Sequence, residues 1–250
     1  MNTVSITRQS HDWWNTVALG GLAVMVFLTI WLSACSSGSP GAADTNKAAA
    51  PPASPSAAVT TNENVPTALA NAGEYGENVY DYAKANGWKN AEVKFTALRD
   101  AVKTVRTDIK DKSQAVDRLE ANVATLDRAV TAKDRQATMR EANQVTLQVA
   151  DMTAAYKLSV PVEVTRLDYY GRELEVWAQA QDVNKLQTTA REMRQTWDTL
   201  RPSIEARSAT EARKFDGLVA RVESATTAAD YARVATPVLN EVDNLEKLFQ

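Results

Sequence analysis

The sequence predicts an all-α protein: an up-down antiparallel helical bundle of about eight helices in two duplicated four-helix units. Two observations lead to this prediction. Apolar residues recur at alternating spacings of three and four, which is the pattern of left-handed helical bundles, and no stretch keeps the alternation of a half-buried strand. The chain also matches itself when it is shifted by about 95 residues.

The self-match extends from residue 64 to the end of the chain. The aligned pairs include Val65-Pro66 with Val160-Pro161, Tyr75-Gly76 with Tyr170-Gly171 and, after a one-residue insertion, Thr131-Ala132 with Thr227-Ala228. Matches at this density predict an internal duplication, with helical repeat 1 at 64–158 and helical repeat 2 at 159–250.

Each repeat carries four apolar stripes, and each stripe predicts one helix. The stripes of the first repeat cover 69–83, 91–109, 116–126 and 142–156, and those of the second cover 164–178, 186–204, 212–222 and 238–249. The connections between stripes are short, so successive helices are expected to run antiparallel.

Residues that start or stop helices separate the stripes. Asn86-Gly87 is expected to end the first helix, Asp134 to precede the fourth, Pro161 to open the fifth and Pro202 to close the sixth. Two alternatives stay open at this stage: a single larger bundle, or a fourth and a fifth helix joined through a kink at Pro161. Both alternatives are all-α.

The first 34 residues have the composition of a secretory signal peptide. A short polar segment with Arg8 precedes an uncharged apolar run from Val17 to Trp31, which is short for a membrane-spanning helix of roughly 20 residues. The run closes on Leu32-Ser33-Ala34-Cys35, which holds the only cysteine of the chain. This segment resembles the signal peptide and lipobox of bacterial lipoproteins.

The resemblance implies that residues 1–34 are removed and that Cys35 becomes the lipidated first residue, anchoring the protein to a membrane. An uncleaved membrane anchor is the alternative. Residues 35–63 are rich in Ala, Pro, Ser and Thr, and they predict a disordered tether because they offer little apolar surface to bury. The expected location is the bacterial cell envelope, and Ser36 beside the cysteine favours the outer membrane, facing the periplasm, if the envelope is Gram-negative.

The expected mature chain lacks several chemically important side chains. His11 is the only histidine and lies in the signal segment, and the thiol of Cys35 is consumed by the lipid. Zinc sites built on His or Cys, Ser-His-Asp triads and disulfides therefore lose a required residue. A formal net charge of −3 without a basic stripe argues against binding to nucleic acid. We expect no enzymatic activity and no cofactor.

Two glycines suggest candidate ligand-binding positions. Gly76 and Gly171 lie on core seams inside helices, where glycine costs about 1 kcal/mol relative to alanine. They indicate either a close approach of two helices, with a neighbouring Trp or Tyr filling the space, or a small pocket in each repeat lined by Tyr75 or Tyr170. Carboxylates that could serve such pockets are Glu77 and Asp81 in the first repeat and Glu173 and Glu175 in the second.

Four arginines recur at the offset of 95, namely Arg99 with Arg194 and Arg106 with Arg201. Each follows a core residue directly, so we expect them to flank the seam and to pair with acids on the adjacent helix. The alternative is that they anchor an anionic ligand. Other acids are expected on solvated faces, where Asp168, Glu173, Glu192 and Asp198 would pair with Arg166, Arg172, Arg191 and Arg194.

The sequence favours a lipid-anchored envelope protein that presents its duplicated bundle as a non-enzymatic scaffold or binding module for another envelope protein. The alternative is a periplasmic carrier of a small ligand or cation held between helices. A bound transition metal is disfavoured, since the di-metal centres of helical bundles normally include a Glu-x-x-His pair.

Overall fold

The computed structural model describes residues 65–109 and 113–250, which form eight α-helices. The helices are α1 (Thr67–Lys84), α2 (Trp88–Asp108), α3 (Ser113–Thr131), α4 (Arg135–Thr153), α5 (Val162–Ala180), α6 (Val183–Arg207), α7 (Ala209–Ser224) and α8 (Ala228–Lys247). The described residues contain no strand, so the all-α prediction is confirmed. The signal segment, Cys35 and the tether lie outside the described residues.

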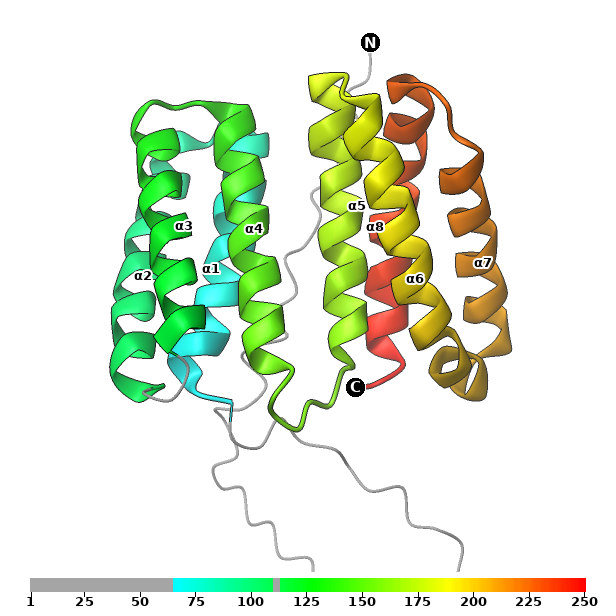
Figure 1. Ribbon diagram of the computed structural model, residues 1–250, viewed down its shortest axis with the longest axis horizontal. Helices are drawn as coiled ribbons and strands as arrows, with labels where there is room; N and C mark the ends of the chain where they lie inside the picture. Colours follow the sequence, from blue (N-terminus) through cyan, green and yellow to red (C-terminus); the bar gives the residue numbers. More distant parts are fainter. Residues whose placement is uncertain (1–64, 110–112) are drawn as a thin grey trace, which may run out of the picture.

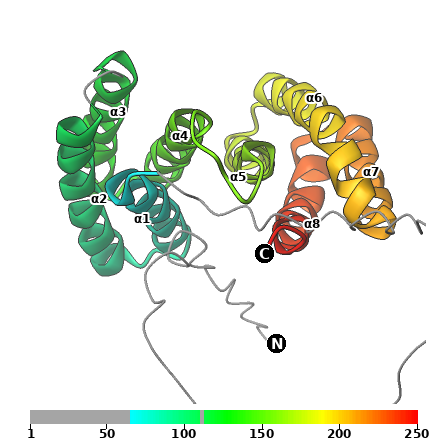
Figure 2. The same ribbon diagram turned by 90° about the horizontal axis from the view of Figure 1, so that it is seen from below.

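Successive helices run up and down, and they form two four-helix bundles side by side (Figure 1). Within each bundle every helix packs against the next one, and the first packs against the fourth. The main contact between the bundles joins α4 to α5, whereas α2 with α3 and α6 with α7 lie at opposite ends of the molecule (Figure 2). None of the described helices is sufficiently long and apolar to cross a membrane.

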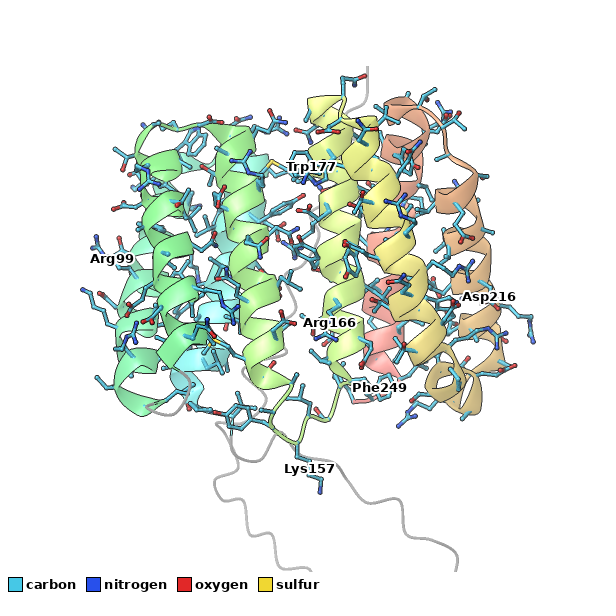
Figure 3. All side chains as sticks on the ribbon, in the orientation of Figure 1. Arg99, Lys157, Arg166, Trp177, Asp216 and Phe249 are labelled. Carbon is cyan, nitrogen blue, oxygen red and sulfur yellow. The ribbon has the colours of Figure 1, made fainter. Side chains whose placement is uncertain are left out.

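Each bundle encloses its own apolar core, built from the predicted stripes. In the second core the fully buried Trp197 lies against Phe215, with ring centroids 4.6 Å apart. Trp177 of α5 packs against both cores (Figure 3). The helix starts keep the sequence offset in three of the four pairs: α5 and α6 begin 95 residues after α1 and α2, and α7 begins 96 residues after α3.

The predicted helix ends near Asn86, Asp134 and Pro161 agree with the structure. Asn86 adopts a left-handed conformation (φ 57°) just beyond α1, and Gln181 does the same (φ 58°) 95 residues later, beyond α5. Asp134 caps α4 by accepting a hydrogen bond from the backbone N–H of Ala137 at 3.0 Å. Pro161 is the residue before the first turn of α5.

The prediction that Pro202 closes the sixth helix is wrong, because α6 continues through it to Arg207. Proline cannot donate the backbone hydrogen bond to the residue four positions earlier, which is Asp198. Pro202 lies on the exposed face of α6, where water can hydrate that carbonyl, while the buried Leu200 and Ile204 keep the apolar stripe on the core. Burial of the stripe outweighs the missing hydrogen bond.

Gly76 and Gly171 allow two helices to approach each other closely, which is one of the two interpretations of these glycines that the sequence offered. A Cβ at Gly76 would lie 3.1 Å from Cγ1 of Val145 on α4, and a Cβ at Gly171 would lie 2.5 Å from Cδ2 of Leu239 on α8. Aliphatic side chains of the facing helix therefore fill the space beside each glycine. The expectation that a Trp or Tyr fills it is wrong, since these close neighbours are aliphatic.

Candidate functional site

Buried polar side chains concentrate where α1 and α4 of the first bundle meet α5 of the second. Arg172 of α5 is the central residue, with only 2% of its surface exposed. Its Nε donates a hydrogen bond to Oδ2 of Asp168 at 2.7 Å, one turn earlier on the same helix. Its guanidinium carbon lies 4.8 Å from the ring centroid of Tyr80 on α1, within the range of a cation–π interaction.

Two carboxylates of α1 approach the same guanidinium from the first bundle. The closest nitrogen–oxygen distances are 3.6 Å to Asp81 and 3.8 Å to Glu77, longer than hydrogen bonds, and Nη1 of Arg172 has no hydrogen-bond partner. Burial acts to lower the pKa of Arg172, but Asp168, Asp81 and Glu77 outweigh it and raise the pKa well above its usual value. The arginine is therefore charged, and its charge holds acids from both bundles.

Glu175 continues this network one turn further along α5. Oη of Tyr80 donates a hydrogen bond to Oε2 of Glu175 at 2.9 Å, and Nζ of Lys84 lies 2.7 and 2.6 Å from the two carboxylate oxygens. Burial, and then the charge of Glu175, raise the pKa of Tyr80 well above its usual value, so the phenol keeps its proton and acts as the donor. Both α1 side chains thus bind one acid of α5.

A third group of hydrogen bonds links α4 to α5. Nδ2 of Asn143 lies 3.1 Å from the carbonyl oxygen of Tyr169 and 3.1 Å from Oε1 of Glu173. Nε1 of Trp177 donates to the other oxygen of Glu173 at 2.5 Å. Burial raises the pKa of Glu173, and the two donors oppose that rise. We call the polar contacts of Arg172, Glu173 and Glu175 with the first bundle the junction network.

The junction network corrects the expectation that the acids and arginines of this region lie on solvated faces. Asp168 and Arg172 pair as expected, but Arg172, Glu173 and Glu175 are buried. The reason is that α5 packs against α6 and α8 on one side and against the first bundle on the other. Its polar face is therefore covered by a second set of helices.

Corresponding positions of the two repeats meet in this network. Glu77 and Arg172 are 95 residues apart and form an ion pair, and Tyr80 and Glu175 are also 95 residues apart and share a hydrogen bond. If positions 77 and 172 carried the same residue, either glutamate or arginine, like charges would face each other and repel. The two repeats therefore differ at positions where they contact each other.

Arg106 and Arg201 bind acids on the adjacent helix, as predicted. Nε of Arg106 donates to Oε1 of Glu120 at 3.0 Å, and Nε of Arg201 donates to Oδ1 of Asp216 at 2.9 Å. Glu120 and Asp216 are 96 residues apart, so the ion pair is repeated in both bundles. Trp197 adds a hydrogen bond to Asp216 at 2.8 Å. These two arginines join α2 to α3 and α6 to α7.

The other arginine pair behaves differently in the two bundles. Arg194 makes two hydrogen bonds to Glu223 of α7, at 2.9 and 2.7 Å, and a third to Asp198 at 3.2 Å. Arg99 is exposed on the outer side of the first bundle (Figure 3). It makes no ion pair with any described residue, so the prediction of a partner acid is wrong for this residue. Asp127, at the position that corresponds to Glu223, has a side chain that is one methylene group shorter.

Tyr75 and Tyr170 pack against the two cores, each partly buried. The ammonium of Lys94 lies 5.4 Å from the ring centroid of Tyr75, and the ring of Tyr169 meets that of Tyr170 edge to face at 5.2 Å. The small pocket expected beside each of them at Gly76 and Gly171 is filled by Val145 and Leu239. The pocket interpretation is therefore wrong at these glycines.

Each bundle has a groove on its outer helices. The α2/α3 groove has a volume of about 260 Å³ and a mainly apolar lining; its residues are Phe95, Arg99, Val102, Lys103, Glu120, Val123, Ala124 and Asp127. The α6/α7 groove has a volume of about 470 Å³ and a mixed lining; its residues are Gln187, Ala190, Arg191, Arg194, Gln195, Glu223, Ala225, Thr226 and Tyr231. Arg99 and Arg194 occupy corresponding positions in the two grooves.

Sequence reasoning missed the junction network, although a signal was present. The residues Thr165, Tyr169, Arg172 and Val176 follow the same spacing of three and four as the core stripe, on another face of α5, and all four are buried. The opposite charges of Glu77 and Arg172 at corresponding positions were a second signal. Within the described ranges, no group of three or more His, Cys, Asp or Glu side chains is arranged to hold a metal ion.

Comparison with protein-family models, with curated proteins and with solved structures found no match to this chain.

Proposed function

We propose that this protein is a lipid-anchored component of the bacterial cell envelope, held through Cys35, that acts as a non-enzymatic scaffold or binding module. The segment Leu32-Ser33-Ala34-Cys35 and the tether that follows support the anchored location, with the outer membrane favoured in a Gram-negative envelope. The absence of histidine after His11 and of cysteine after Cys35 supports a role without nucleophilic or histidine-based catalysis.

One observation of the fold supports the binding role: the two four-helix bundles have differently lined grooves at opposite ends of the molecule. The junction network ties the bundles together through ion pairs and buried hydrogen bonds. The α2/α3 groove and the α6/α7 groove belong to helix pairs that lie at opposite ends of the molecule (Figure 2). A body of this kind can hold two partners, or two segments of one partner, at a fixed separation.

A carrier of a small ligand is the second candidate, and the α6/α7 groove is the observation in its favour. Its volume of about 470 Å³ lies within the usual range of small-molecule sites, roughly 300 to 1,000 Å³. Its mixed polar and apolar lining would suit a small polar ligand.

Photo-cross-linking in living cells tests the binding role. A photoreactive amino acid replaces Gln195 in the α6/α7 groove or Lys103 in the α2/α3 groove, and matched variants carry it at the exposed positions Arg118 and Arg213, outside both grooves. We expect discrete cross-linked envelope proteins from the groove positions only. Equal products from all four positions, or none from the grooves, would contradict a binding module.

Cys35→Ala in the same cells tests the anchor. The substitution removes the acylation site, so the protein should leave the membrane fraction or accumulate with residues 1–34 attached. Unchanged fractionation and unchanged mass would contradict lipidation at Cys35.

A further inference from the structure

The α6/α7 groove contains an arginine without an acidic partner. Gln187, Arg191 and Gln195 follow each other at intervals of four along α6 and therefore share one face of the helix, which forms one wall of the groove. The opposite side consists of Glu223, the turn at Ala225 and Thr226, and the ring of the buried Tyr231. Hydrogen-bonding side chains of α6 thus form one wall of the groove.

The two arginines of the groove differ in their partners. Arg194 is held by Glu223 and Asp198. The guanidinium of Arg191 donates one hydrogen bond, to Oγ1 of Thr188 at 3.0 Å, and forms no ion pair with any described residue. It is also close enough to Tyr231 for its charge to oppose the rise in that phenol's pKa caused by burial. Arg191 therefore has guanidinium donors available next to the groove.

The lining carries one net positive charge, because Glu223 balances only one of the two arginines. One net charge matches a carboxylate, whereas a phosphate group carries up to two negative charges near neutral pH. A guanidinium binds a carboxylate through two parallel hydrogen bonds. The glutamine amides on either side both donate and accept, so they suit the N–H and C=O groups of a peptide backbone.

We propose that the α6/α7 groove binds an acidic peptide segment of a partner protein, with Arg191 pairing with a glutamate or aspartate side chain of that segment. This inference rests on the proposed binding role and specifies the chemistry of one groove. The first bundle carries Glu92, Thr96 and Asp100 where the second carries Gln187, Arg191 and Gln195. Two acids flank that position in the first bundle and would repel the same segment, so we expect the acidic segment to bind the α6/α7 groove in preference to the α2/α3 groove, although Arg99 lines the latter.

Ligand-observed NMR titration of the full chain in detergent tests the proposal. The probes are an acetylated and amidated Ala-Glu-Ala tripeptide, its Ala-Gln-Ala counterpart, and inorganic phosphate. We expect the Glu peptide to bind and both other probes to bind more weakly. Arg191→Gln should weaken binding of the Glu peptide by about tenfold, since a charge-assisted hydrogen bond is lost. Arg213→Gln is the matched control: Arg213 also donates to a threonine three residues earlier, outside the groove.

Three results would overturn the proposal: no binding of the Glu peptide, binding that Arg191→Gln and Arg213→Gln change equally, or tighter binding of phosphate. If such a result came with cross-links from Gln195 in cells, the binding role would stand and only the ligand chemistry would be wrong. If the cross-links were absent as well, the proposed function would fail together with this inference.

Discussion

At the scale of single residues, Arg172 differs from the other arginines because its charge is buried between two bundles. Asp168 holds it on its own helix, and Asp81 and Glu77 approach from α1. Removing one member of a buried charge group leaves the others without compensation, which costs about 3 to 5 kcal/mol, much more than the loss of an exposed ion pair. Arg172 should therefore be among the most sensitive polar residues of the chain.

Arg172→Met should lower the free energy of unfolding by about 3 to 5 kcal/mol, because three carboxylates lose their shared cation. Arg166→Met is the matched control: Arg166 lies on the same helix and binds Asp151 at 2.8 Å, but at the surface (Figure 3), so its loss should cost about 1 kcal/mol or less. Chemical denaturation of both variants measures the difference. Equal losses of unfolding free energy in the two variants would contradict a buried ionic network at the junction.

A second residue-scale prediction concerns Glu241 of α8. Its side chain is buried against Glu211 of α7, and its Oε1 has no hydrogen-bond partner, while Lys214 binds Glu211 at 2.9 Å. Burial, followed by the hydrogen bond and charge of Glu211, raises the pKa of Glu241 to about 7. Between pH 4.5 and 7 the folded protein thus keeps a proton that the unfolded chain has released, so stability falls as the pH rises through this window.

Glu241→Gln should flatten that decline and stabilise the protein at pH 7.5 by about 1 to 2 kcal/mol, since the amide stays neutral. The measurement is denaturant unfolding of the wild type and the variant at pH 5 and pH 7.5. Burial also raises the pKa of Glu246 to about 7, so part of the slope should persist in the variant. Identical slopes for the two proteins would rule out Glu241 as a source of the pH dependence.

At the scale of helices, three glycines form a graded series. Gly171→Ala should destabilise the protein by about 1 to 3 kcal/mol, because the new methyl group would lie 2.5 Å from Leu239. Gly76→Ala should cost less, since its closest neighbour is Val145 at 3.1 Å. Gly217→Ala of α7 has nothing within 4 Å and should stabilise by up to about 1 kcal/mol through helix propensity. Thermal or denaturant unfolding should reproduce this order, and a neutral Gly171→Ala would contradict the close approach of α5 and α8.

The helices could be predicted from the sequence because each has one apolar stripe and recognisable ends. The error at Pro202 shows that a continuing stripe, here to Ile204, indicates the helix end better than a proline on the exposed face. The polar face of α5 could not be assigned by the same reasoning. A charged residue on a helix surface has the same local pattern whether water or a second bundle covers it, so the burial of Arg172 depends on how the two repeats are placed.

The site residues illustrate the same limit. The ion pairs of Arg106 and Arg201 were predicted because repeated arginines beside a core seam can reach acids on the next helix. Arg99 makes no ion pair with a described acid, and a groove lies beside Arg191. Both features depend on distances between helices that no spacing in the sequence encodes.

At the scale of the whole molecule, two four-helix bundles of the same helix order give two ends with different properties. The repeats share helix positions and the arginine pairs, but they differ where they meet, at Glu77 with Arg172 and Tyr80 with Glu175. They also differ in their outer grooves: the α2/α3 groove is mainly apolar, whereas the α6/α7 groove has a mixed lining and carries Arg191 where the first repeat has Thr96. The divergent contacts at the junction fix the separation of these grooves, and the proposed scaffold role depends on that fixed separation.

The separation of the two ends is therefore the most direct measurement. Spin labels at Lys103→Cys on α2 and Arg213→Cys on α7, in a Cys35→Ser background, report the distance between the outer helices by pulsed electron paramagnetic resonance. A single narrow distance distribution is expected for the chain with an intact junction network, and a broader one when Arg172→Met is added. A broad distribution with Arg172 in place would contradict a rigid two-bundle body.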